Sequence, residues 1–216
     1  MEVYHRSALA KHVLLVNCTE MKSIQELPFV AGHVALDFVN TAEERGDPRA
    51  EDVLLSPADL RIWGRRYGLI GASAKTADDR AELERALELR ELLYRVFSAW
   101  AHARPPAPRD LDRLGAFAAD GYRAGRVRAD GDGDGHVQWH WNRSDLASVR
   151  HVVATSAVEL LRAGPARLKQ CPGDQCGWLF IDTTKRGNRR WCQMRECGQE
   201  AKDERRRQRR PARGAG

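Results

Sequence analysis

Two pairs of cysteines near the end of the chain constrain its fold more than any other feature. Four of the five cysteines lie in pairs with the same Cys-x4-Cys spacing, and fifteen residues separate the pairs. A pair so spaced on a tight turn can direct both sulfurs at one point, and two pairs supply the closed four-thiolate shell of a structural zinc ion. Two disulfides or four buried thiols are the alternatives, but disulfides need an oxidising compartment and nothing in the sequence indicates export. The sequence therefore predicts a Zn²⁺ site with the ligands Cys171, Cys176, Cys192 and Cys197.

A site of this kind organises structure and carries no catalysis. Metal binding contributes folding energy directly, so about 40 residues can be ordered around it with little hydrophobic core. The apolar segment 177–182 lies between the cysteine pairs and predicts a strand packed over the metal. Four thiolates leave zinc no open coordination position. The chain also lacks a Gly-rich phosphate loop, a Ser-His-Asp order and a metal-spaced histidine pair, so we expect no enzyme.

The charge of the chain is concentrated in the same region. Residues 167–213 hold 14 of the 36 lysines and arginines but only 6 of the 30 acidic residues, a net charge of +8 against +6 for the whole chain. A basic segment on a near-neutral body predicts a polyanionic partner, most simply nucleic acid, and a solvated disordered tail is the alternative. The best candidates for phosphate or base contacts are Arg186, Arg189, Arg190, Arg205, Arg206 and Arg209.

The chain before the cysteines is mostly helical in pattern. Ser56-Pro57 begins a helix that Gly68 ends, and apolar residues at helical spacing predict a long helix over about 77–102. A short helix is expected at 111–117, and another over 145–163 with Ser144 as its N-cap.

Between the last two of these helices, alternating residues flank an Asp-Gly repeat and predict a hairpin. Trp141 stands where a calcium loop requires glutamate, which excludes a calcium loop. The fold class is mainly α with a small β-hairpin: a helical N-terminal domain plus a C-terminal four-cysteine zinc-binding module with a terminal basic helix.

These patterns divide the chain into three segments. We expect an N-terminal extension over 1–27, for which Met21 is an alternative start, a helical regulatory domain over 28–164, and a zinc finger with a basic tail over 165–213. The metal would stabilise the finger, whereas a hydrophobic core would stabilise the helical domain. The substitution Cys176→Ser should therefore unfold the finger and leave the helical domain folded. No apolar run approaches the roughly 20 residues that span a bilayer, so we expect a cytoplasmic, nucleoid-associated protein with no membrane partner.

Three polar residues near the start of the helical domain could line a ligand pocket. A helix is expected from about His33 to Glu43, and it would align His33, Asp37 and Asn40 at spacings of four and three. The alternative is that these side chains hydrogen bond to loop backbone and hold the helix in place, as buried polar groups commonly do.

The cysteine region resembles a known family. Residues 171–183 read C-P-x3-C-G-W-L-F-I-D-T and residues 188–198 read N-R-R-W-C-x-M-x2-C-G, which is similar to the CGNR-type zinc finger. Residues 29–41 resemble the start of the ABATE domain that commonly precedes this finger. The resemblance covers about residues 29–210 and implies a bacterial transcriptional regulator, sometimes described as stress-induced, whose finger binds DNA and whose helical domain senses a ligand.

The chain departs from that pattern at one point. The motif that names the family would place Asn at 199 and Arg at 200, whereas this chain has Gln199 and Glu200. The charge reversal at Glu200 puts a DNA contact there in doubt, and the carboxylate could instead pair with Arg190 or favour the amino end of the last helix.

The resulting hypothesis is a zinc-finger DNA-binding transcriptional regulator with a ligand-sensing N-terminal domain. We expect DNA as the partner, with a small-molecule effector and a homodimer as open possibilities. The alternative is an RNA- or protein-binding zinc module attached to a small-molecule-binding helical domain.

Overall fold

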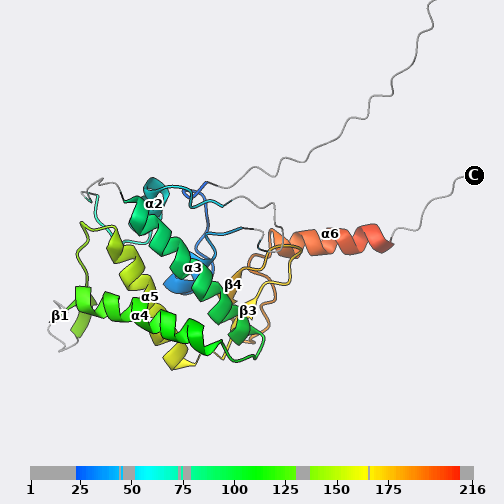
Figure 1. Cartoon of the computed structure of the whole chain (residues 1–216). Helices are drawn as coiled ribbons and strands as arrows, with labels where there is room; N and C mark the ends of the chain where they lie inside the picture. Colours follow the sequence, from blue (N-terminus) through cyan, green and yellow to red (C-terminus); the bar gives the residue numbers. More distant parts are fainter. Residues whose placement is uncertain are drawn as a thin grey trace, which may run out of the picture.

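The computed structural model describes residues 23–43, 45, 52–72, 74, 79–129, 137–164 and 166–209. Within these ranges the chain forms helices and two antiparallel hairpins (Figure 1). The helices are α1 (Val34–Val39), α2 (Pro57–Arg66), α3 (Arg80–Ala101), α4 (Pro108–Ala124), α5 (Ala147–Ala163) and α6 (Cys197–Arg209). The strands are β1 (Arg126–Ala129), β2 (Val137–His140), β3 (Leu168–Gln170) and β4 (Leu179–Ile181). The mainly helical class with a basic terminal helix is confirmed.

Some predictions fall outside the described ranges. These are most of the N-terminal extension with Met21, the start of the long helix at 77–78, the Asp-Gly turn at 130–135 and the tail beyond residue 209. None of the described helices has the length and apolar character needed to cross a membrane.

Helix α2 begins where its sequence predicts. The Ser56 side chain accepts from the N–H of Asp59, and the Asp59 carboxylate accepts from the N–H of Ser56, which completes a capping box with Pro57 in the first turn. Its Leu60 and Trp63 are fully buried, which confirms them as core residues.

Three other helices differ from their predicted bounds. Helix α1 ends at Val39, before the predicted end at Glu43. The chain then leaves the helix, and Ala42 pairs with Asp52 in an isolated bridge. Helix α4 is longer than predicted and begins at Pro108, a residue whose missing N–H is harmless at that position. Helix α5 lacks the predicted Ser144 cap; the Asp145 carboxylate accepts from the N–H of Ala147 instead, at 2.9 Å.

The body is a helical bundle in which α3, α4 and α5 pack on one another. Helix α1 lies against both α3 and α5, and it also contacts β4. Strands β1 and β2 are exposed and pair at one end of the bundle (Figure 1).

A second hairpin, β3–β4, joins the cysteine region to this bundle. Strand β3 packs on α3 and strand β4 packs on α1. Trp178, Leu179 and Phe180 are buried in the same hydrophobic core as Phe38 and Leu93 of the helical body. The cysteine region is therefore built onto the helical body through a shared core.

Candidate metal centre and basic helix

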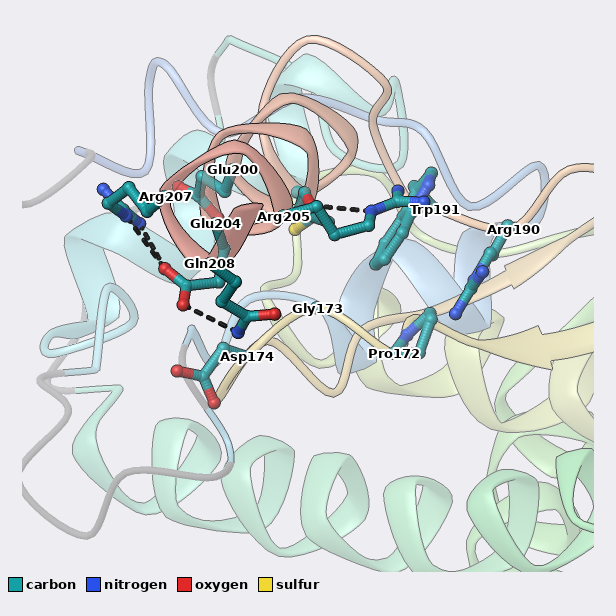
Figure 2. Close-up of a pocket in the computed structure, with 12 residues that line it drawn as sticks. Pro172, Gly173, Asp174, Arg190, Trp191, Glu200, Glu204, Arg205, Arg207 and Gln208 are labelled. Carbon is teal, nitrogen blue, oxygen red and sulfur yellow. Dashed lines mark hydrogen bonds and ion pairs between the residues drawn. The ribbon is translucent and has the colours of Figure 1, made fainter. Parts of the chain in front are cut away.

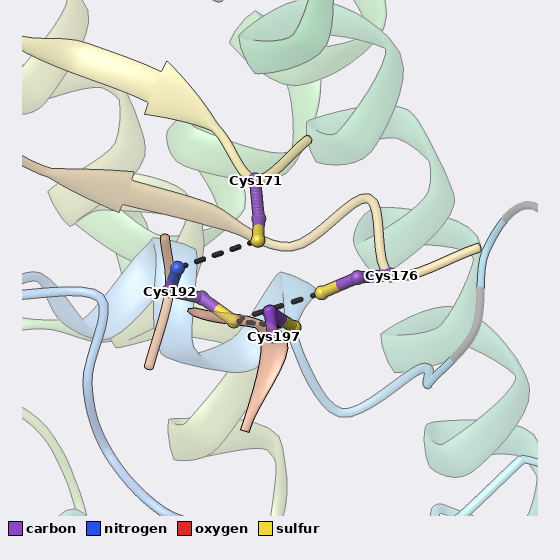
Figure 3. A group of neighbouring side chains, drawn as sticks. All are labelled: Cys171, Cys176, Cys192 and Cys197. Atoms are coloured by element: carbon purple, nitrogen blue, oxygen red, sulfur yellow. Dashed lines mark hydrogen bonds between the residues drawn. The ribbon is translucent and has the colours of Figure 1, made fainter. Parts of the chain in front are cut away.

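The four paired cysteines converge on one point. Their sulfurs all lie within 4.8 Å of one another, and the four thiols are free (Figure 3). The Sγ atom of Cys192 is 3.6 Å from that of Cys176 and 3.6 Å from that of Cys197. These separations are far beyond a disulfide bond of about 2.05 Å. A tetrahedral ion with metal–sulfur bonds of about 2.3 Å has sulfur–sulfur edges of about 3.8 Å, so the cluster has the size of a metal shell.

The surroundings of the thiols fit a bound cation. Hydrogen bonds from the neighbouring thiols, Cys176 first, and from the N–H of Cys192 lower the pKa of Cys171. The contact with Cys171, followed by those with Cys176 and Cys197, raises the pKa of the Cys192 thiol. Four thiolates this close repel one another, so the full set of ligands needs a cation at its centre.

A glycine leaves the room that the sulfurs occupy. A Cβ atom added to Gly173 would lie 2.9 Å from the Sγ atom of Cys197 and 3.2 Å from the Cβ atom of Cys176. Contacts that short do not occur for real side chains, so the turn between Cys171 and Cys176 requires glycine there. Ligand chemistry, sulfur spacing and turn chemistry all fit a four-cysteine metal site.

A buried carboxylate organises the loop between the strand β4 and the third cysteine. Asp182 is fully buried, and it accepts hydrogen bonds from the N–H and hydroxyl of Thr184 and from the N–H of Arg189. The Lys169 ammonium donates to Asp182 at 2.7 Å and to the carbonyls of Gly187 and Arg189. Burial acts to raise the pKa of Asp182, but these hydrogen bonds outweigh it and hold that pKa well below its ordinary value. An ionised carboxylate therefore holds the loop together.

The structure places Arg189, a predicted nucleic-acid contact, inside this framework. Its guanidinium donates to the carbonyls of Val30, Trp191 and Cys192, and it lies 4.3 Å from the centre of the Phe180 ring. These contacts tie the loop to the helical body. The Arg189 side chain is a structural crosslink, and its predicted contact with nucleic acid stays a prediction.

The other two loop arginines lie at the surface. Arg186 and Arg190 are both exposed, and the Arg190 guanidinium lies 4.9 Å from the centre of the Trp191 ring. An exposed guanidinium held against an aromatic face is a suitable donor to a phosphate.

Helix α6 carries the remaining predicted arginines and begins at the fourth cysteine. Arg205, Arg206 and Arg209 are exposed, and the helix extends away from the rest of the described chain (Figure 1). Since Cys197 is both a member of the cysteine cluster and the first residue of α6, the cluster fixes the origin of this helix.

A crease of about 620 Å³ separates α6 from the turn that carries Gly173 (Figure 2). Glu200 lines this crease together with Arg190, but across the described residues no ion pair joins the two. The predicted pairing of Glu200 with Arg190 is therefore absent. Glu200 does lie in the first turn of α6, where a carboxylate is favourable.

The three residues predicted for a ligand pocket are engaged inside the protein. The Asp37 carboxylate is 2% exposed and accepts from the N–H of Ala31 and the hydroxyl of Tyr67. Burial raises the pKa of Asp37, and the two hydrogen bonds oppose that shift. The His33 ring caps α1 by accepting from the N–H of Ala35, and burial lowers its pKa, which favours the neutral acceptor form.

Asn40 holds the cysteine region against the body. Its side-chain amide donates to the carbonyl of Leu179 and its side-chain oxygen accepts from the Leu179 N–H, each at 2.9 Å. Asn40 is 1% exposed. His33 and Asn40 bind backbone groups, and Asp37 binds the N–H of Ala31 and the hydroxyl of Tyr67, so these side chains fix the elements around α1. A ligand pocket lined by the three residues stays a prediction.

Sequence reasoning missed several residues that build this junction. Gln170 accepts from the Ser98 hydroxyl and donates to the Tyr94 hydroxyl, both on α3. The Trp178 indole donates to the carbonyl of Ala42. These contacts join residues more than 70 positions apart, and no local pattern marks them. The apolar character of residues 178–181 was the one sequence feature that indicated a buried contact in this region.

Comparison with known families agrees with this geometry. The model of the ABATE family, "Putative stress-induced transcription regulator", matches residues 32–164. The CGNR zinc finger model matches residues 167–210, which include the four cysteines. No curated protein matches the chain. The chain belongs to the ABATE family, and a CGNR zinc finger forms its C-terminal part.

Proposed function

We propose that this protein is a transcription regulator that binds duplex DNA through its zinc-supported basic helix. The observation that carries the proposal is the origin of α6 at Cys197: the metal site fixes one end of an exposed, arginine-rich helix that extends from the body. An α-helix fits the DNA major groove, and arginine and lysine supply phosphate contacts and guanine recognition there. The match to a regulator family supports the same function.

Zinc is the metal that suits this site. Four thiolates in a cluster of this size suit a structural zinc ion, with no coordination position left for a substrate. When bound, the ion supplies fixed geometry and folding energy. The residues of the chain carry the recognition: Arg186 on the loop, and the basic side chains of α6.

The first test is binding of the zinc-loaded protein to random duplex DNA across a salt series, followed by selection of bound sequences. We expect affinity to fall steeply between about 50 and 200 mM salt and selection to enrich a defined site. The metal content of the same preparation, measured by elemental analysis, should be one zinc per chain.

A competition arm separates this function from an RNA-binding one. Single-stranded RNA of random sequence is added to the protein–duplex complex at equal nucleotide concentration. Retention of the duplex is the expected result. Preferential transfer to the RNA, or absence of any salt-dependent duplex binding, would overturn the proposal.

A further inference from the structure

The two faces of helix α6 differ in net charge: one is basic, and the other balances acidic with basic side chains. Lys202, Arg206 and Arg209 are spaced by four and three residues, so they share one face. All three are exposed, and none of them borders the crease between α6 and the body. We call these three residues the outer stripe.

The face toward the body mixes carboxylates with guanidiniums, because Asp174, Glu200 and Glu204 line the crease together with Arg190, Arg205 and Arg207. Glu200 and Glu204 are four residues apart, so they follow one another along the helix, and both line the crease together with Asp174 of the cysteine turn (Figure 2). Glu204 accepts from Arg207 at 2.9 Å and from Gln208 at 2.9 Å. The negative charge of Glu204 is therefore balanced by Arg207 of the same helix.

Arg205 lies on the crease side as well. Its Nε atom donates to the carbonyl of Ala201 at 3.0 Å, and its side chain extends beside Trp191 (Figure 2). Its neighbour Arg206 lies on the outer stripe, where its one ion pair is a long contact of 3.7 Å to Asp203.

Resting on the proposed DNA-binding function, we infer that α6 presents its outer stripe to duplex DNA and turns the crease away from it. A phosphate in the crease would meet three carboxylates beside three guanidiniums, so the crease offers no net positive charge. A phosphate on the outer stripe meets three cations and a single carboxylate, that of Asp203. The stripe spans eight residues, or about 10 Å along the helix axis at 1.5 Å per residue, and an α-helix about 10–12 Å in diameter fits a major groove about 12 Å wide.

This orientation also accounts for the charge reversal at Glu200. Because Glu200 faces the crease, its carboxylate lies on the side of α6 that DNA does not contact. The acidic residue at this position is then compatible with DNA binding through the opposite face.

Adjacent arginines offer a matched test of the inference. Arg206 and Arg207 have side-chain exposures of 78% and 72%, and each pairs with the acidic residue three positions before it. Removing either positive charge changes the net charge equally, so the two variants differ in the face that loses charge and in the closer pairing of Arg207 with Glu204. Arg206→Gln and Arg207→Gln are compared in the full-length zinc-loaded protein, with a short duplex of random sequence as the probe.

The outer-stripe variant alone should lose a phosphate contact. We expect Arg206→Gln to weaken binding severalfold and to lower the slope of log affinity against log salt by about 1, as the loss of one phosphate contact does. Arg207→Gln should stay within about twofold of wild type with an unchanged slope. Circular dichroism and zinc content verify that both variants are folded.

Each other outcome has a definite meaning. Equal effects in the two variants, or a larger loss in Arg207→Gln, would overturn the inference while the proposed function stands on the binding of wild type. Failure of wild type to bind duplex DNA would overturn the proposed function, and the inference with it.

Discussion

Asn40 shows how one buried amide can connect two parts of this molecule. Its side chain satisfies both the N–H and the carbonyl of Leu179, as a neighbouring strand would. Only an amide can do this, because it offers a donor and an acceptor side by side. The pairing places β4 against α1. It also satisfies the backbone N–H and carbonyl of Leu179 on the edge of β4 that faces away from β3.

We therefore expect Asn40→Asp to destabilise the protein. The substitution keeps the size of the side chain but replaces the donor with an acceptor that faces the Leu179 carbonyl. An unpaired buried carbonyl together with a desolvated carboxylate should lower the free energy of unfolding by roughly 2–4 kcal/mol. Urea denaturation of the zinc-loaded protein measures the loss.

Asn142 provides a control of the same residue type. Its side-chain oxygen accepts from the N–H of Ser144 at an exposed position, and a carboxylate can accept the same bond. Asn142→Asp should change stability by less than about 0.5 kcal/mol. A comparable loss in both variants would show that the Asn40 pairing contributes nothing specific.

Individual residues were predictable from the sequence where their partners are local. The four cysteines form two short-range pairs, so their convergence followed from spacing alone. Asp37 and Asn40 were correctly seen as neighbours on α1, but their partners on Tyr67 and Leu179 lie far along the chain. The choice between a ligand pocket and a structural role depended on those distant partners.

At the scale of elements, the turn between the first two cysteines is defined by the absence of a side chain at Gly173. We expect Gly173→Ala to weaken zinc binding by roughly tenfold, because the new methyl group would displace the sulfur of Cys197 from the shell. Competition with a chromophoric zinc chelator measures the affinity.

A second glycine gives the opposite expectation. Gly115 lies inside α4 with open space where its Cβ would be, so Gly115→Ala should raise stability by about 0.5–1 kcal/mol and leave zinc affinity unchanged. Equal zinc affinity in Gly173→Ala and wild type would refute the steric role of this turn.

Elements with their own capping signals were predicted well, and those set by tertiary pairing were not. The start of α2 at Ser56-Pro57 is a local feature and is found where the sequence indicates, whereas the Ser144 cap predicted for α5 is not formed. Strand β3 escaped prediction because three residues of mixed polarity carry no periodic signal. Its existence depends on pairing with β4 and packing on α3.

For the whole molecule, the main revision concerns the independence of the zinc finger. Sequence composition indicated a small module that would unfold alone when a ligand is lost. In the structure, the core of the finger is continuous with that of the helical body, and hydrogen bonds from Asn40, Gln170, Trp178 and Arg189 cross the junction. Loss of the metal should therefore be felt by the helices.

Removal of zinc is the prediction that follows for the molecule as a whole. Structural zinc contributes about 10–16 kcal/mol to the folding of small finger peptides, whereas a typical domain is stable by only about 5–15 kcal/mol. A chelator should therefore lower the melting temperature by roughly 10 °C or more, since 1 kcal/mol corresponds to about 2–4 °C in a chain of this size. Amide exchange of the zinc-free protein should show Leu93 in α3 and Leu179 in β4 losing protection together, because both lie in the shared core. Zinc, but not magnesium, should restore both, because thiolates are poor ligands for a cation that prefers oxygen. If Leu179 lost protection while Leu93 kept the protection of the zinc-loaded protein, the finger would be an independent unit and the continuous core would carry no coupling.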